Sequence, residues 1–450
     1  MSRLAVEQSV DILPELVEGR RKSRTRAIYP VFPVAARAPV GSRARGMSAP
    51  KNYDATSART RLKTVELFSG IGGFRVACDA HGFHTVWAND IDAKACVVYR
   101  ARFGKSVLRE GDVRSFANEI PEHDLLTGGF PCQPFSSAGK KKGIGDPRGT
   151  LFESIVETLA QKAPTFFVLE NVKRLLSMED GSHFATIITA LAELDYRIEW
   201  RLLNAMHFGL PQNRQRVVIV GVHSRAIDAT SMQRALLATT EDLADLSGVD
   251  REAFLGGTRR WTAIERHGRR FPWWGIARKG RFFGATLERF GDAQPMPALR
   301  SILQRPDDVS PEFDFTESTK ERLKHNEVVN RFVQGVEILS NQGGGARMGY
   351  TIFGINGVAP TLTAATSRHY ERYKIGDRFR RLTNVEYARL QGFPSNHCRE
   401  ISTYDQYMLY GNAVPPPMVE WVLGRMRSGG AAIPKVASFP QLTLSYAAGE

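Results

Sequence analysis

One cysteine of the chain lies in a setting that suits a nucleophile. Cys132 stands between Pro131 and Pro134, in a segment that directly follows a predicted strand. The prolines make this loop rigid and so hold the thiol in one direction, and a thiolate is the strongest common side-chain nucleophile near neutral pH. We expect the other three cysteines to be small buried apolar side chains, namely Cys78, Cys96 and Cys398. Cys132 is therefore the candidate nucleophile.

Two further segments place charged side chains at the ends of predicted strands. Glu170 ends one strand, and residues 212–216, which read Gln-Asn-Arg-Gln-Arg, come just before another. Arg214 and Arg216 are two positions apart in this segment. They either point fixed guanidinium groups toward an oxyanion or a phosphate, or they lie on an exposed strand edge. Glu170 is either a functional acid or an ordinary surface acid or helix cap.

A glycine-rich turn, residues 68–73, follows the first predicted strand. Glycines let a ligand approach the backbone, and a helix start favours anionic groups. Asp90 ends the next predicted strand, where a carboxylate can accept both hydroxyls of a ribose, and Asp112 ends a third. The spacing lacks the third glycine of GxGxxG, which favours another adenosine cofactor over a dinucleotide. Glycine turns also end many purely structural strands, so the turn alone leaves the question open.

These candidate residues need a sheet that brings strand ends together. Strands alternate with helices from residue 64 to residue 222, which predicts an open α/β sheet. In such sheets, ligands bind outside the carboxyl ends of the strands. The predicted strands include 64–68, 84–88, 124–128, 165–169, 197–203 and 217–222, and the predicted helices include 92–103, 184–194 and 383–391, the last opened by a capping box.

The region from about residue 225 to 355 does not show this alternation of strands and helices. Between Arg251 and Arg300 there are eleven basic and four acidic residues, and aromatic side chains are interleaved with them. Such a mixture suits contact with phosphates together with contact or stacking on bases. Alternatively, the aromatic side chains form the core of a small mixed domain and the charges are solvated. The aromatic residues are Trp261, Phe271, Trp273, Trp274, Phe282 and Phe283.

The composition is that of a soluble globular protein with a polyanionic partner. The chain has 450 residues, 42% of them hydrophobic, and its 61 Lys+Arg against 47 Asp+Glu give a net charge of +14. No stretch of about 18 apolar residues predicts a membrane span, and no basic-then-apolar pattern predicts secretion. Four cysteines are too few for a disulfide framework and show no zinc-type spacing, which favours a reducing cytosol.

The first 60 residues differ in composition from the rest of the chain. Up to Gly46 they include nine basic and four acidic residues, with no sustained apolar period. We expect a basic extension that is disordered, although a basic arm touching a phosphate backbone is the alternative. Met47 is a second possible start of translation.

Taken together, the motifs resemble those of the DNA (cytosine-5)-methyltransferases of bacterial restriction-modification systems. They occur in the order of that family and cover roughly residues 62–222 and 376–428. The segments with the resemblance are Glu66–Phe74, Gly129–Ser136, Glu170–Val172, Gln212–Arg216, Arg389–Pro394 and Gly411–Val414.

The resemblance implies an α/β fold. It would be the open, Rossmann-like sheet of S-adenosylmethionine-dependent methyltransferases, with a second, smaller target-recognition domain. The implied divisions are a basic extension (1–60), a catalytic and cofactor-binding domain (61–224), a target-recognition domain (225–400), a segment completing the catalytic domain (401–428) and a tail (429–450).

The resemblance also assigns S-adenosylmethionine as the cofactor, with no metal. Asp90 would bind the ribose, at a position where the family often has glutamate, and Asp112 would meet the adenine amino group. The residues implied at the cofactor pocket are Phe68, Gly70, Ile71, Gly73, Asp90, Asp112, Pro131, Asn412 and Val414.

The mechanism implied by the family begins with attack of Cys132 at C6 of a cytosine that has left the duplex stack. Glu170 would bond N3 and the exocyclic amine, and Arg216 would bond O2 and help hold Glu170 ionised. Arg214 is a candidate for contact with the cysteine loop or a phosphate. The candidate DNA contacts are Gln133, Ser136 and Gln212.

The implied partner is double-stranded DNA, with a cognate restriction endonuclease as a functional partner. We expect a monomer in the bacterial cytoplasm, at the nucleoid when bound to DNA. A tRNA methyltransferase of the same family is the first alternative, but the Cys-Phe-Thr tripeptide of that branch is absent. A silent DNA-binding homologue would be expected to have lost Cys132, Glu170 or Arg216, and a nicotinamide oxidoreductase would need the missing glycine.

Overall fold

A computed structural model describes most of the chain. The described residues are 62–131, 151–226, 235–244, 246, 261–342, 350–362 and 371–427. The candidate residues Cys132, Gln133 and Ser136 lie outside them, as do the basic extension (1–60) and the tail (429–450).

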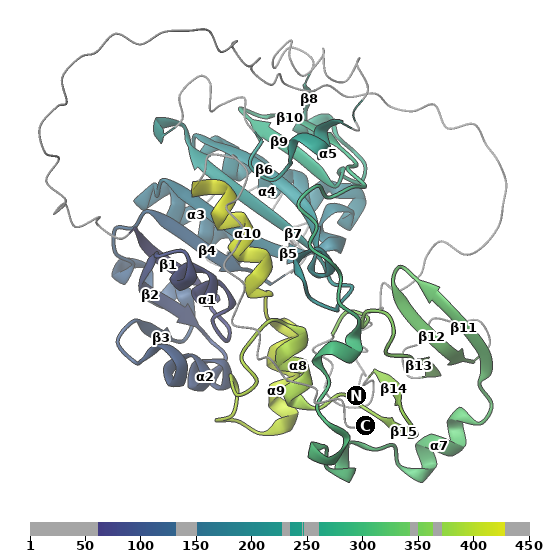
Figure 1. Ribbon diagram of the computed structural model, residues 1–450. Coiled ribbons are helices and arrows are strands. Elements are labelled where there is room, and N and C mark those ends of the chain that lie inside the picture. The colour runs from purple at the N-terminus through teal and green to yellow at the C-terminus, as the bar shows by residue number, and fades with distance from the viewer. Residues whose placement is uncertain are drawn as a thin grey trace, which may run out of the picture.

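A ten-stranded sheet forms the larger part of the molecule (Figure 1). Its order is β3-β2-β1-β4-β5-β7-β6-β9-β10-β8, with parallel pairing from β3 to β5 and antiparallel pairing beyond. The α/β fold with an open sheet is thereby confirmed. The strands are β1 (Lys63–Leu67), β2 (His84–Asp90), β3 (Leu108–Glu110), β4 (Leu125–Gly129), β5 (Phe166–Val172), β6 (Tyr196–Asn204), β7 (Gln215–His223), β8 (Thr262–Ala263), β9 (Trp274–Arg278) and β10 (Arg281–Ala285).

Helices cover both faces of this sheet, because its central strands are apolar on both sides. Along β5, Val168 joins one hydrophobic cluster while Phe167 and Leu169 join another on the opposite face. On the Val168 face lie α1 and α10, and on the other lie α3 and α4. The helices around the sheet are α1 (Gly73–Ala80), α2 (Ala93–Phe103), α3 (Leu151–Lys162), α4 (Ser182–Glu193), α5 (Thr240–Ala244) and α10 (Pro416–Arg427).

The large sheet continues past residue 225, where we expected the second domain to begin. β9 pairs with β6, with Trp274 opposite Arg201, so residues 262–285 extend the large sheet. The aromatic residues of this stretch explain the difference: Trp274, Phe271 and Phe283 are buried in the two cores beside the sheet, and this apolar surface is stable only against another apolar layer. Most of these aromatic side chains are therefore buried, but in the cores of the large sheet and not in the core of a separate small domain.

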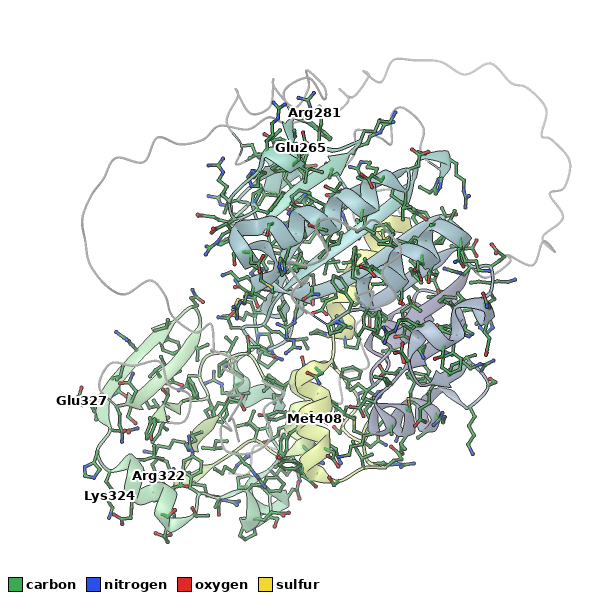
Figure 2. All side chains as sticks on the ribbon, turned by 180° about the vertical axis from the view of Figure 1, so that it is seen from behind. Glu265, Arg281, Arg322, Lys324, Glu327 and Met408 are labelled. Atoms are coloured by element: carbon green, nitrogen blue, oxygen red, sulfur yellow. The ribbon has the colours of Figure 1, made fainter. Side chains whose placement is uncertain are left out.

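A second, five-stranded sheet lies apart from the first (Figure 1). Its order follows the chain, with only β13 and β14 parallel among the described strands. Seen from behind, Arg322, Lys324 and Glu327 lie on the outer side of this part, far from Arg281 on the large sheet (Figure 2). Its elements are α7 (Glu317–Leu323), β11 (Glu327–Val333), β12 (Val336–Asn341), β13 (Ile352–Phe353), β14 (Arg372–Ile375) and β15 (Arg378–Arg380).

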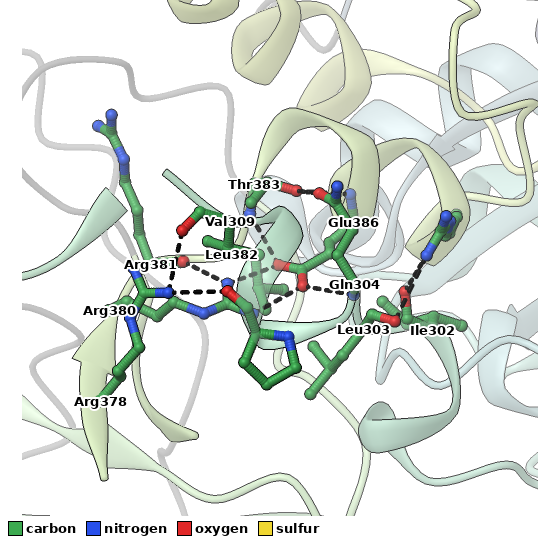
Figure 3. Close-up of polar contacts among 12 residues, drawn as sticks. Ile302, Leu303, Gln304, Val309, Arg378, Arg380, Arg381, Leu382, Thr383 and Glu386 are labelled. Atoms are coloured by element: carbon green, nitrogen blue, oxygen red, sulfur yellow. Dashed lines mark hydrogen bonds and ion pairs between the residues drawn. The ribbon is translucent and has the colours of Figure 1, made fainter. Parts of the chain in front are cut away.

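Helices α8 (Asn384–Leu390) and α9 (Thr403–Asn412) lie between the two sheets (Figure 1). The predicted capping box at Thr383 and Glu386 is present. The Glu386 carboxylate also accepts hydrogen bonds from the Arg380 side chain at 2.7 Å and from the Gln304 backbone amide at 2.9 Å (Figure 3). These contacts join α8 to β15, so the orientation of the helix depends on the second sheet.

Candidate active site

The glycine-rich turn after β1 is fixed by backbone hydrogen bonds. The Ser69 amide donates to the Asn89 carbonyl at 2.9 Å, and the Gly72 amide donates to the Ser69 carbonyl at 2.9 Å. Gly70 and Gly72 have φ angles of 54° and 84°, in the region that favours glycine. The turn is therefore a rigid connection between β1 and α1.

Three glycines of this turn serve two different purposes. A Cβ atom at Gly72 would overlap the ring of Phe103, and one at Gly73 would overlap the Val414 carbonyl. By contrast, nothing lies within 4 Å of the Cβ position at Gly70. Gly72 and Gly73 therefore allow the chain to pack closely on itself, while Gly70 leaves open space beside the backbone where a ligand can approach.

Asp90, at the end of β2, is part of the same turn. Its Oδ2 accepts a hydrogen bond from the Gly70 amide at 2.7 Å, and its Oδ1 accepts one from the Asp92 amide at 2.8 Å. Burial raises the pKa of this carboxyl, and the backbone hydrogen bonds oppose that rise. Since each carboxylate oxygen accepts more than one hydrogen bond, the fixed carboxylate retains capacity for the hydroxyls of a ribose.

Asp112 follows β3 and is engaged by its own neighbour. Its carboxylate accepts from the Arg114 amide and side chain, and the Arg114 hydrogen bonds lower the pKa of the carboxyl. An adenine amino group at Asp112 would therefore share this carboxylate with Arg114.

The segment after α9 meets the turn directly. Val414 is buried beside α1, and its carbonyl lies against Gly73. Asn412 is exposed at the end of α9. Val414 thus lies beside Gly73, although more than 300 positions separate them in the chain. Pro131 is the last described residue before residue 151 and is exposed.

Glu170 and Arg216 form an ion pair across β5 and β7. Arg216 Nε lies 2.8 Å from Glu170 Oε1, and about nine-tenths of each side chain is buried. Burial raises the pKa of Glu170, and the charges of Arg216 and Arg214 oppose the rise. The carboxyl is thereby held in one orientation by a cation, yet its environment also favours accepting a proton.

The chain segment that leads to Cys132 lies beside this ion pair. Gly129 pairs with Glu170 in the parallel register of β4 and β5. A Cβ at Gly129 would lie 3.5 Å from Glu170 Oε2. The buried Asn171 side chain donates to the Phe130 carbonyl at 2.9 Å. Asn171 is a positioning contact that the sequence motif contained but whose role only the geometry reveals.

Arg214 and Gln212 are located differently from what we expected. Arg214 is fully buried and donates to the carbonyls of Leu362, Gly411 and Ala413 at 2.8–3.1 Å. Gln212 is also fully buried, and its amide donates to the Leu390 carbonyl at 3.0 Å. Neither side chain reaches the surface, and their hydrogen bonds go to internal carbonyls instead of facing a phosphate or DNA. Both instead join the β6–β7 connection to later segments, because a buried polar group needs internal partners.

A surface hollow of about 340 Å³ lies beside β10 and the segment that leads to β9. Its lining includes Arg269, Arg270 and Trp273, and the Lys173 ammonium lies 5.4 Å from the Trp273 ring centre. Trp273 directly precedes β9, whose first residue, Trp274, pairs with Arg201 of β6. Glu170 and Arg216 lie at the same end of the neighbouring strands. Basic side chains thus border the edge that holds the ion pair.

Within the described residues, no group of three or more His, Cys, Asp or Glu side chains is arranged to hold a metal ion. Over the same part of the chain, no helix combines the length and apolar character needed to cross a membrane.

The sequence matches the family model "C-5 cytosine-specific DNA methylase" over residues 62–428. It is 31% identical over 376 residues to "Type II methyltransferase M1.ScrFI" of Lactococcus lactis subsp. cremoris, covering 81% of this chain and 78% of that protein. It is 28% identical over 382 residues to "Type II methyltransferase M.NlaX" of Neisseria lactamica, covering 83% of this chain and 98% of that protein.

Among solved structures, the fold is similar to that of the S. pombe Dnmt2 methyltransferase. The TM-score is 0.53 with 18% sequence identity, covering 81% of this chain and 97% of that chain. This likeness concerns the fold alone. The family match covers most of the chain, and so the chain belongs to the C-5 cytosine-specific DNA methylases and is a DNA (cytosine-5)-methyltransferase.

Proposed function

We propose that this chain methylates C5 of a cytosine that has left the duplex stack, through a covalent bond between Cys132 and C6 of the ring. The principal support is the Glu170–Arg216 ion pair beside the segment that leads to Cys132. A buried carboxyl that a guanidinium group fixes, close to the last described residues before Cys132, can stabilise the charge that develops on the ring when a nucleophile adds to it.

The proposed chemistry follows from the weak nucleophilicity of C5. The Cys132 thiolate adds to C6, which moves an electron pair toward C5 and N3. Glu170, in its protonated form, donates its proton to N3 and accepts a hydrogen bond from the exocyclic amine, which neutralises the negative charge that develops at N3, while Arg216 bonds O2 and holds the carboxyl in place. C5 would then bond the methyl carbon of the donor as the bond from that carbon to the sulfonium sulfur breaks, and the donor would leave as a neutral thioether. Loss of the C5 proton to a base and expulsion of the Cys132 thiolate restore the aromatic ring.

The methyl donor of this family is S-adenosylmethionine, whose sulfonium supplies an electrophilic methyl carbon. The described residues fit such a molecule in two respects. Open space adjoins the Gly70 backbone, and the buried Ser69 hydroxyl has no hydrogen-bond partner within the described part of the chain. We propose that Asp90 holds the ribose and Asp112 the adenine amino group, with the remaining pocket formed by Phe68, Gly70, Ile71, Gly73, Pro131, Asn412 and Val414.

For the substrate we propose duplex DNA, with the target base flipped out at a cost of a few kcal/mol. Gln133 and Ser136 stay candidate contacts on either strand. The Type II names of the relatives support pairing with a restriction endonuclease. We further propose a monomer that acts in the cytoplasm at the nucleoid. Residues 225–400, apart from strands β8, β9 and β10 of the large sheet, would recognise the target sequence.

Methyl transfer from labelled S-adenosylmethionine tests the substrate class. Duplex DNA, transfer RNA and single-stranded DNA serve as separate acceptors, and we expect label in duplex DNA. Label in transfer RNA alone would establish the RNA alternative, and label in none would refute the proposal. Bisulfite sequencing of plasmid DNA from expressing cells then identifies the recognised sequence and the cytosine.

A further inference from the structure

The loop between α8 and α9 reaches back to the glycine-rich turn through one histidine. His397 is 2% exposed, and its Nε2 lies 2.8 Å from the Ile71 carbonyl oxygen. A carbonyl oxygen only accepts hydrogen bonds. Nε2 therefore has the proton and donates it to Ile71.

This bond completes the fixation of one peptide unit in the turn. On one side of the Ile71–Gly72 peptide, the carbonyl accepts from His397, and on the other the Gly72 amide donates to the Ser69 carbonyl at 2.9 Å. The Gly72 carbonyl in turn accepts from the Val76 amide at 3.0 Å and so begins α1. Rotation of the peptide would break both of its hydrogen bonds, so the path of the backbone from Gly70 to α1 depends on them.

The histidine ring is itself held from several directions. It packs against the rings of Phe393 and Phe103, with centroid distances of 4.6 and 6.2 Å. Arg102 Nε donates to the His397 carbonyl at 2.8 Å, and Arg102 also pairs with Glu400. The ring position is thus set by packing, and the donated hydrogen bond transmits that position to the turn.

We propose that His397 is a positioning residue for the S-adenosylmethionine site, which it serves by holding the Ile71 carbonyl. The inference rests on the proposed function, because it concerns the same turn. His397 touches no reacting atom. Its loss would leave the turn free to reorient and would weaken cofactor binding, while the groups around Glu170 would stay in place.

Two substitutions separate the donated hydrogen bond from the packing of the ring. H397F keeps a ring between Phe393 and Phe103 but has no donor, whereas H397Q has a donor at about the same reach without the ring. Binding of S-adenosylmethionine to the full chain is measured by calorimetry without DNA. An unsatisfied buried carbonyl is costly, so we expect about tenfold weaker binding for H397F and at most about threefold for H397Q. H325F, at an exposed histidine, is the matched control and should bind as the wild type does.

The kinetic readout distinguishes positioning from general loss of structure. For H397F we expect the KM for S-adenosylmethionine to rise about tenfold, with kcat and the KM for DNA changed less than about threefold. Thermal unfolding establishes that each variant is folded. If H397F does not fold, H397N, whose shorter amide cannot reach Ile71, takes its place with the same expectation.

Wild-type affinity in H397F would overturn the inference, and so would equal losses in H397F and H397Q, since both results would remove the role of the donor. Either result leaves the proposed function intact, provided the wild type binds the cofactor and methylates DNA. Failure of the wild type itself to bind S-adenosylmethionine would instead refute the proposed function.

Discussion

The Asn171 side-chain amide donates a hydrogen bond to the Phe130 carbonyl across the parallel strands β4 and β5. Asn171 directly follows Glu170, and Phe130 stands two positions before Cys132. The bond therefore connects the strand of the proposed acid with the segment that leads to the proposed nucleophile, inside the protein and away from water.

Replacing Asn171 with Ala tests this connection. The change leaves the buried Phe130 carbonyl without its donor, which should lower the free energy of unfolding by about 1–3 kcal/mol. We expect kcat to fall at least tenfold with cofactor affinity unchanged, because the turn after β1 makes no use of this bond. Urea unfolding and single-turnover methylation provide the two measurements. Unaltered kcat in a folded variant would show that the bond does not position the nucleophile loop.

Replacing Cys132 with Ala should abolish turnover while S-adenosylmethionine still binds. The thiolate is the only group that we assign to attack on C6, so no residue substitutes for it. Calorimetry and labelled methyl transfer distinguish the two properties. A duplex that contains 5-fluorocytosine at the target should become cross-linked to the wild type and not to the variant. Turnover by C132A at the wild-type rate would refute the covalent mechanism.

Replacing Glu170 with Gln keeps the size of the side chain but removes the proton that the carboxyl can transfer to N3. Electrostatic stabilisers of this kind contribute roughly 100- to 1000-fold to kcat, and we expect a loss of that order. The affinity for S-adenosylmethionine, measured in the same preparations, should stay within about threefold. A variant with nearly wild-type kcat would exclude Glu170 from contact with the reacting ring.

Glu66 should make stability depend on pH. This β1 side chain is fully buried, and burial raises its pKa from 4.5 to about 8, although a hydrogen bond from Tyr99 at 2.8 Å opposes the rise. Between these values the folded state holds a proton that the unfolded state has lost. The free energy of unfolding therefore falls as pH rises from about 5 to 8, by up to about 1.4 kcal/mol per pH unit.

E66Q tests this dependence, because glutamine can still accept from Tyr99 but does not titrate. Urea unfolding at pH 5.5, 7 and 8.5 should show a flatter dependence for the variant, whose stability relative to the wild type increases with pH. Parallel curves for the two proteins would contradict the raised pKa of Glu66.

The basic side chains around the hollow before β9, among them Arg270, should contribute to DNA affinity. Arg270 is exposed beside the hollow, while Lys279 is exposed at the opposite end of β9. Since each neutralised phosphate adds about 0.9 to the slope of log affinity against log salt, R270A should lower that slope by about 1. K279A removes the same charge and should leave the slope unchanged. Identical slopes for R270A and the wild type would place the duplex elsewhere.

The sequence alone determined much of the sheet and the identity of the candidate residues. Short-range patterns define such features. The strand before residue 68, the glycine turn, the helix predicted from residue 92 and the capping box at Thr383 each depend on neighbours within a few positions. Glu170 and Asp90 were identified because acids at strand ends meet at one edge of a parallel sheet. For these short motifs, the predicted strand, turn and helix starts agreed with the structure.

Only the tertiary structure decided which distant segments share contacts. Arg214 and Gln212 have the same charge and polarity whether they face DNA or the interior, and burial against residues 362 and 411–413 made them internal connections. His397 stands in none of the motifs, and its bond to Ile71 spans 326 positions. Long-range pairing of this kind depends on how whole layers pack, because a hydrogen bond forms only where packing brings donor and acceptor within about 3 Å.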